Sequence, residues 1–368
     1  MQTYFDREDT KVIKGIAILL MLAHHLWAFP DRIYGGGFTA ILSVFGMPLS
    51  VFIGKFGKIC VSLYFFLSGY GLYKSSRGKK LDILLRLKGL YSSYWKVFFL
   101  FIPIAFLFFS NQPEYCEEAS LCFRYAALSN REFISNVLGI TCTYNSEWWF
   151  FRAYVVALLT FPFLNRIMDN RPVVYNIAGI IVFSILETNV FPAIGQLEVL
   201  GSPMNNVLYS SLFCQSSPFI TCFWMGILMA REDLLGKVRE GLINNHLLNP
   251  ITDIIVLACI PYLENCVFGS YLDFLFVPAV ILFSLDLLER CNWVRKILHA
   301  LGAQSTNMWL IHSFFCYYFY FFVRITVYSN NALISLITLV AMTYAASIMT
   351  DKIWKTVFGM GRKIGVIH

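Results

Sequence analysis

Two ionisable side chains, Lys14 and His25, lie in the first apolar stretch of the chain, KGIAILLMLAHH. Eleven residues turn an α-helix through about 1100°, roughly 20° past three full turns, so both side chains share one stripe, about 16 Å apart. An ionisable group in a membrane span is costly and therefore a candidate functional group. A neutral imidazole accepts a proton from an alcohol, which makes His25 a candidate general base. The alternatives are an interfacial His25 beside Trp27 and an ordinary snorkelling lysine at position 14.

Cations and small residues mark two further candidate regions. The segment 74–91 is the most basic in the chain, and its Arg86 and Lys88 lead into an apolar stretch. Such cations bind phosphates of a ligand or the headgroups of anionic lipids. Ser68 and Gly69 form a thin patch that admits either a slender ligand or the backbone of a neighbouring helix.

Polar and aromatic residues also cluster in two later apolar stretches. Glu147, Trp148 and Trp149 are typical of a surface that stacks on sugars, and equally of the tryptophan belt at a membrane interface. Arg152, inside a span, is expected to pair with a carboxylate or to line a cavity. His312 lies near the middle of a later span, which favours a role in a pocket.

The composition predicts an all-α, polytopic transmembrane helix bundle. The chain is 58% hydrophobic and only 14% charged, whereas soluble domains carry about 25% charged residues. No cleavable signal peptide is expected, so the first helix stays in the membrane. Apolar stretches long enough to span a bilayer are predicted at 12–30, 58–75, 91–110, 148–167, 173–190, 206–230, 251–268, 271–289, 300–323 and 332–350. The pair 251–268 and 271–289 must form a tight hairpin, or else one re-entrant segment.

The basic residues orient this ten-span arrangement. With a cytoplasmic N-terminus, 21 of the 29 Lys and Arg residues fall in cytoplasmic segments and six in external loops, as the positive-inside rule requires. Both termini are therefore predicted to be cytoplasmic. The net charge of +7 reports this orientation and does not indicate a nucleic-acid partner.

The ten cysteines do not indicate a metal site, because they lack paired spacing. Cys116, Cys122 and Cys142 share one predicted external loop. Two of them can form a disulfide, and the alternative is that all three are ordinary small apolar residues.

Taken together, these motifs resemble the acyltransferase-3 family, membrane enzymes that O-acylate cell-surface glycans and related molecules. The first-helix pattern of a basic residue, Gly and a later His maps onto Lys14, Gly15 and His25. Four further patterns map, in order, onto Phe65 to Gly69, onto Arg86 and Tyr91, onto Trp149, Phe150, Tyr154 and Pro162, and onto Leu301, Gly302, Ser305 and Trp309 to His312. The resemblance covers nearly the whole chain and implies a single transmembrane acyltransferase domain over residues 1–368.

The resemblance implies an acyl-CoA donor, usually acetyl-CoA, as co-substrate, with no tightly bound cofactor and no metal. It implies His25 as the catalytic residue and an acceptor hydroxyl outside, on a glycan or lipid-linked saccharide. Donor-binding roles then fall to Lys14, Arg86, Lys88, Tyr91, Ser68 and Gly69. Acceptor-binding roles fall to Glu147, Trp148, Trp149, Arg152 and His312. The expected location is a bacterial plasma membrane, with membrane lipids as neighbours.

Two positions depart from the family pattern. Lys14 replaces an arginine, which keeps the charge but loses the planar guanidinium fork, and Gly89 replaces the second arginine of the Arg-x-x-Arg motif. Two other functions stay open. One is a transporter or flippase that uses His25, Arg152 and His312 as relay groups, and the other is a catalytically silent sensor.

Overall fold

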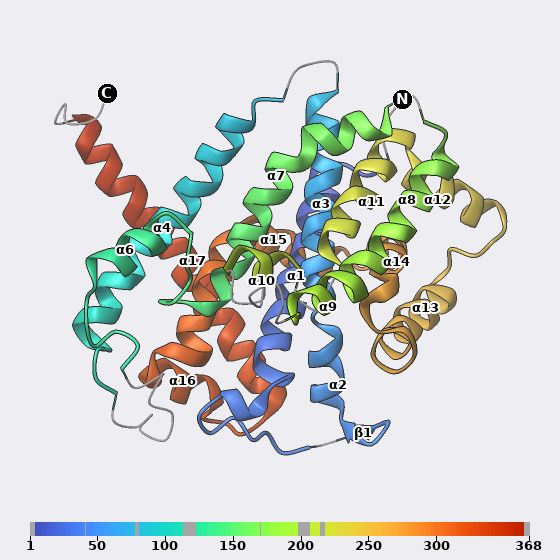
Figure 1. Cartoon of the computed structure of the whole chain (residues 1–368). Coiled ribbons are helices and arrows are strands. Elements are labelled where there is room, and N and C mark those ends of the chain that lie inside the picture. Colours follow the sequence, from blue (N-terminus) through green and yellow to red (C-terminus); the bar gives the residue numbers. More distant parts are fainter. Residues whose placement is uncertain are drawn as a thin grey trace. The chain divides into compact units, whose positions relative to one another are not determined.

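The protein is built almost entirely of helices (Figure 1). The structure, a computed structural model, describes residues 4–40, 42–77, 81–112, 123–169, 171–197, 207–213 and 218–363. A short antiparallel pair of strands, β1 (Ser43–Val44) and β2 (Met47–Pro48), precedes α2. The α-helices are α1 (Arg7–Trp27), α2 (Leu49–Phe56), α3 (Ile59–Ser76), α4 (Ile83–Phe108), α6 (Asn130–Val137), α7 (Trp149–Met168), α8 (Val173–Ile185), α9 (Phe191–Gly195), α10 (Val207–Phe213), α11 (Phe219–Glu232), α12 (Leu234–Asn244), α13 (Pro250–Tyr262), α14 (Asp273–Glu289), α15 (Asn292–Ser313), α16 (Tyr320–Val327) and α17 (Ala332–Lys363).

The helices confirm the predicted polytopic membrane bundle. Among the described residues, seven stretches are long and apolar enough to cross a membrane, or up to eight if α15 and α16 form one bent span. The predicted spans 251–268 and 271–289 fall in a single apolar stretch, Pro250–Glu289, where α13 and α14 pack against each other. The total of ten spans and the cytoplasmic side of both termini stay predictions.

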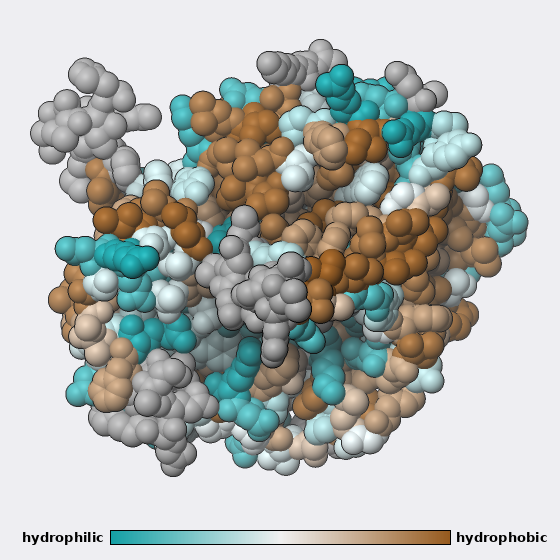
Figure 2. All heavy atoms as spheres, in the orientation of Figure 1, coloured by the Kyte–Doolittle hydropathy of each residue, from teal (hydrophilic) through white to brown (hydrophobic). Residues whose placement is uncertain are grey.

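Many apolar side chains remain exposed on the outside of these helices, and the face drawn in Figure 2 carries broad hydrophobic areas. Val174 on α8 and Ile251 on α13 are more than two-thirds exposed, at 73% and 72%. Exposed apolar surface of this extent marks a contact with an apolar partner. On spans of this length, that partner is the hydrocarbon of a bilayer.

The chain divides into two compact units. The first unit comprises residues 1–24, 52–83 and 150–303, and the second comprises residues 25–51, 84–149 and 304–368. Both units are assembled from three separate segments of the chain, so neither is a simple sequence domain. The single domain over residues 1–368 stays a prediction.

Two glycines let α3 and α11 approach closely within the first unit. A side-chain carbon added to Gly69 would collide with the carbonyl oxygen of Phe223, and one added to Gly226 would collide with that of Phe66. The contact is thus reciprocal, with each glycine facing the backbone of the other helix. Small residues drive such close packing in membranes, where apolar burial alone gives no preference for protein over lipid.

A similar pair of glycines brings α1 against α15 in the first unit. A side-chain carbon on Gly15 would collide with the carbonyl oxygen of Leu298, and one on Gly302 with that of Lys11. Gly15 of the first motif and Gly302 of the last motif therefore lie in the same helix–helix contact.

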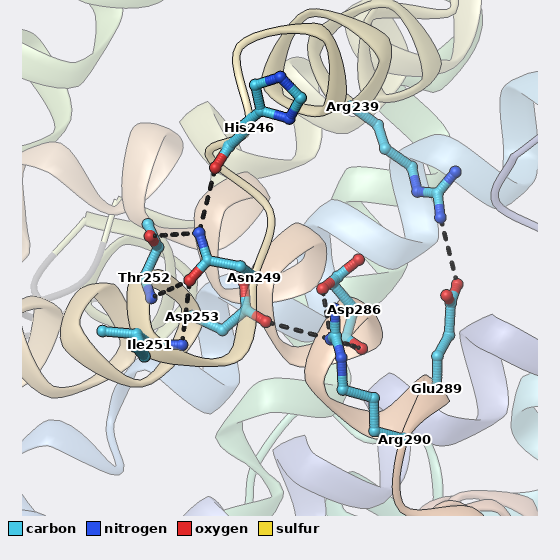
Figure 3. A network of polar contacts seen from close by, with 9 residues as sticks. All are labelled: Arg239, His246, Asn249, Ile251, Thr252, Asp253, Asp286, Glu289 and Arg290. Carbon is cyan, nitrogen blue, oxygen red and sulfur yellow. Dashed lines mark hydrogen bonds and ion pairs between the residues drawn. The ribbon is translucent and has the colours of Figure 1, made fainter.

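Figure 3 shows a polar network that links α13 to the end of α14 in the first unit. The Arg290 guanidinium donates to Asp286 Oδ2 at 2.5 Å and to Asp253 Oδ2 at 3.4 Å. Asn249 begins α13 by accepting hydrogen bonds from the backbone N–H groups of Ile251 and Thr252. One cation therefore serves two carboxylates, of which the Asp253 side chain is fully buried.

Gly69→Ala is expected to destabilise the protein by about 1–3 kcal/mol, because overpacking a close helix contact shifts the backbones apart. Gly71→Ala, two residues along the same helix, is the matched control, since no atom outside its immediate neighbourhood in the helix lies within 4 Å of the added carbon. Alanine there favours the helix by roughly 0.5–1 kcal/mol. Thermal unfolding in lipid nanodiscs measures both variants. Equal melting temperatures for the two would contradict the close approach of α3 and α11.

Arg290→Gln is expected to lower stability by about 1–3 kcal/mol, because it leaves the buried Asp253 and Asp286 carboxylates without their cation. Glu289→Gln removes an exposed ion pair to Arg239, 3.3 Å long, and leaves the contact of the Arg239 guanidinium with the Tyr4 ring in place. It is expected to cost only about 0–1 kcal/mol. The same unfolding measurement compares Arg290→Gln with Glu289→Gln. A loss in Glu289→Gln as large as that in Arg290→Gln would show that burial does not set the cost.

Candidate active site

The second unit brings His25, near the end of α1, together with two residues of a much later segment. The imidazole of His25 lies 4.7 Å from that of His312, between ring centroids, and 5.8 Å from the ring of Tyr317. His312 is completely buried and Tyr317 is 5% exposed, whereas His25 is half-buried. Two predicted site residues, His25 and His312, are thus neighbours.

A π-helix, η9 (Phe314–Tyr318), follows the last residue of α15, Ser313, and so begins two residues after His312. On a regular α-helix, residues five apart point about 140° away from each other. In a π-helix the i→i+5 hydrogen bonds place residues five apart one turn from each other. The widened turn is what lets both His312 and Tyr317 contact His25.

The chain then breaks at Phe319, where α15 and α16 meet at 89°. The side chain of Gln112 bridges this break. Its Nε2 donates to the carbonyl of Tyr318 at 2.9 Å, and its Oε1 accepts from the N–H of Tyr320 at 2.8 Å. Gln112 is 4% exposed, so these two bonds satisfy backbone groups that water does not reach.

A second set of bonds fixes the start of α7 beside η9. Asn145 is completely buried; its Nδ2 donates to Ser313 Oγ at 2.7 Å, and its Oδ1 accepts from the N–H of Glu147. The indole N–H of Trp148 donates to the carbonyl of Leu310 at 3.0 Å. These bonds hold Glu147, half-buried, next to the histidine-bearing helix end.

Two arginines of the second unit add positive charge to this region. Arg32 and Arg124 both interact electrostatically with the Glu147 carboxylate. The Arg124 guanidinium lies 4.6 Å above the ring of Tyr318 and donates to the carbonyl of Thr143. The site therefore combines two imidazoles with one carboxylate and two guanidinium groups.

One tyrosine close to this region lies outside the candidate spans. Burial raises the pKa of Tyr125 well above its ordinary value. Its hydroxyl stays protonated and donates to the carbonyl of Tyr144 at 2.7 Å.

The remaining predicted acceptor residues fall in both units. Trp148 is 1% exposed and packs edge-on against Tyr94 at 5.0 Å, so its ring lies in the core. Trp149 is half-buried at the start of α7. Arg152 belongs to the first unit, where it is 9% exposed.

The predicted donor residues are spread over both units. Lys14, Ser68 and Gly69 belong to the first unit, where Lys14 is half-buried and the Ser68 hydroxyl donates to the Tyr64 carbonyl. Gly69 faces the α11 backbone, and its donor-binding role stays a prediction.

The donor residues on α4 belong to the second unit. Arg86 and Lys88 are exposed there. The Tyr91 hydroxyl donates to the Leu138 carbonyl at 2.9 Å. This bond ties the start of a predicted span to a segment predicted as an external loop, so the residues after α6 fold back along α4.

The predicted disulfide lies mostly outside the described residues. Cys116 and Cys122 are not among them, and Cys142 is not joined to any cysteine that the structure describes.

A bundle of apolar helices with an imidazole pair on two of them defines an integral, multi-pass membrane protein with groups suited to proton transfer. A family model described as an acyltransferase domain matches residues 8–351. The chain therefore belongs to the acyltransferase-3 family, which confirms the resemblance carried by its motifs. No curated protein and no solved structure matches it.

Three residues of the site carried no recognisable signal in the sequence: Gln112, Asn145 and Tyr317. Tyrosine is common among the aromatic residues of this chain, and no motif marks Tyr317. Gln112 and Asn145 lie at or near the ends of a long loop, where polar residues are ordinary. A polar side chain that is buried and fully bonded becomes visible only in three dimensions.

Gln112→Leu is expected to destabilise the protein by about 1–3 kcal/mol for each backbone group left without a partner at the α15–α16 break. Acyl transfer is expected to fall with it, since η9 then loses its fixed position. Gln112→Glu keeps the acceptor for the Tyr320 N–H but loses the donor to the Tyr318 carbonyl. Its stability and activity are expected to lie between those of the wild type and those of Gln112→Leu. Unfolding and transfer rates in nanodiscs measure the series. A fully stable and active Gln112→Leu protein would rule out this bridging role.

Proposed function

We propose that this acyltransferase moves an acetyl group from cytoplasmic acetyl-CoA to a hydroxyl group of an extracytoplasmic glycan or lipid-linked saccharide. The observation that carries the proposal is the half-buried imidazole of His25, positioned by two buried side chains of the second unit. Family membership supports acyl transfer as the reaction class. The predicted location is a bacterial plasma membrane.

His25 acts as the general base in this proposal. The acceptor O–H gives its proton to the imidazole while its oxygen bonds to the carbonyl carbon of the thioester. The C–S bond then breaks, and the CoA thiolate takes the proton from the imidazolium. The products are an O-acetyl ester and free CoA, so atoms and charge balance. General-base catalysis of this kind typically contributes about 10²–10⁴-fold to the rate.

Cations support binding of the donor. Arg86 and Lys88 are exposed near the start of α4, where the positive-inside rule predicts the cytoplasm. Their charges suit the phosphates of CoA. Lys14, in the predicted inner half of α1, carries a positive charge without the guanidinium fork, so it attracts a phosphate as a point charge. Acetyl-CoA is a co-substrate here and no tightly bound cofactor is required.

Polar groups near His25 support binding of the acceptor. The Glu147 carboxylate can accept hydrogen bonds from sugar hydroxyls, and the positive charges of Arg32 and Arg124 act on it. His312 is buried behind His25. We therefore assign Glu147 to the acceptor and His312 to the support of His25.

His25→Ala is expected to reduce acetyl transfer at least a hundredfold, because it removes the general base. The assay follows labelled acetate from acetyl-CoA into base-labile esters of the glycan fraction in membranes that contain the full-length protein. His24→Gln is the matched control, since the His24 ring nitrogen Nδ1 lies 2.8 Å from the Gly54 carbonyl instead. It is expected to retain most of the activity.

Undiminished ester formation by His25→Ala would overturn the assignment of the base. Movement of a labelled saccharide across the membrane without any new ester would instead indicate the transporter function that the sequence left open.

A further inference from the structure

The hydroxyl group of Tyr317 contacts His25 in two places. It donates to the backbone carbonyl of His25 at 2.5 Å, and the same oxygen lies 3.3 Å from His25 Nδ1. The two rings meet edge to face, at 83°. Tyr317 is 5% exposed, so packing fixes these contacts.

The number of hydrogens on the Tyr317 hydroxyl decides which atom donates and which accepts in these contacts. A phenol has one hydrogen, and a backbone carbonyl can only accept. The Tyr317 hydrogen is therefore committed to the His25 carbonyl, and the oxygen presents a lone pair toward Nδ1. A hydrogen bond at that position requires hydrogen on Nδ1. In a neutral imidazole the other nitrogen, Nε2, then holds the lone pair.

We propose that Tyr317 is a positioning residue that holds His25 as the Nδ1–H tautomer, so that Nε2 is the base of the transfer reaction. This inference rests on the proposed function, in which His25 takes the proton of the acceptor hydroxyl. Tyr317 keeps its own proton throughout and does not touch the reacting atoms. Its role is to decide which nitrogen of His25 can receive a proton.

His312 obeys the same proton count. Its Nδ1 lies 2.6 Å from the carbonyl of Trp309, which can only accept, so Nδ1 carries hydrogen. Both imidazoles therefore hold hydrogen on Nδ1 and a lone pair on Nε2.

The test combines kinetics with the tautomer itself. Tyr317→Phe keeps the aromatic ring and removes only the hydroxyl. Its kcat for acetyl transfer is expected to fall about tenfold to a hundredfold, with little change in the KM for acetyl-CoA, because a misassigned tautomer removes the base without disturbing the donor. Nitrogen-15 NMR of histidine-labelled full-length protein in nanodiscs reports hydrogen on each ring nitrogen, and a His25→Asn sample assigns the His25 signals.

In the wild-type protein, His25 is expected to show hydrogen on Nδ1 and none on Nε2. In Tyr317→Phe, both tautomers are expected. Tyr125→Phe is the matched control, because it removes another buried tyrosine hydroxyl that donates to a backbone carbonyl, that of Tyr144 at 2.7 Å. It is expected to leave the His25 tautomer unchanged.

A wild-type His25 with hydrogen on Nε2 overturns the inference, even if Tyr317→Phe fails to fold. An unchanged His25 tautomer in Tyr317→Phe also overturns the inference, because it would show that Tyr317 only packs against His25. Both results leave acetyl transfer by the wild type intact, and with it the proposed function. Absence of acetyl transfer by the wild type would remove the proposed function, while the NMR result would still decide the tautomer.

Discussion

A helix that breaks among buried side chains exposes backbone groups that need hydrogen-bond partners, and the candidate site depends on how this chain supplies them. The break at Phe319 frees the carbonyl of Tyr318 and the N–H of Tyr320, and the side chain of Gln112 binds both. Asn145 bonds Ser313 at the end of α15, and the Tyr318 hydroxyl of the π-helix accepts from the backbone N–H of Ser146. These bonds support the wide turn and the break that follows it.

The geometry of η9 matters because it decides which side chains meet His25. A continuous α-helix would direct residues 312 and 317 about 140° apart. The wider turn directs both toward the end of α1, where one buried imidazole and one phenol contact His25. A half-buried imidazole with fixed neighbours suits the proposed proton transfer from an alcohol, since the orientation of the lone pair is then set in advance.

Glycines bring the helices of the first unit into close contact. Gly15, Gly69, Gly226 and Gly302 all face the backbone of a neighbouring helix there. For Gly69 this is the helix-packing alternative that the sequence left open, and its donor-binding role stays a prediction. Gly15 and Gly302, which belong to the first and last motifs, join α1 to α15.

The sequence by itself determined the class of protein and its family, and it singled out His25 as a candidate. Apolar stretches of span length, the placement of Lys and Arg and the ordered motifs all follow from local composition and spacing, which need no knowledge of contacts. The tertiary structure decided what surrounds His25. Trp148 proved to be a core residue, Gly69 a packing residue, and Tyr317 and Gln112 the partners of the site. The reason is physical: a hydrogen bond between residues 292 positions apart, such as that of Tyr317 to His25, has no counterpart in local sequence, and a π-helix has no periodicity that a sequence pattern displays.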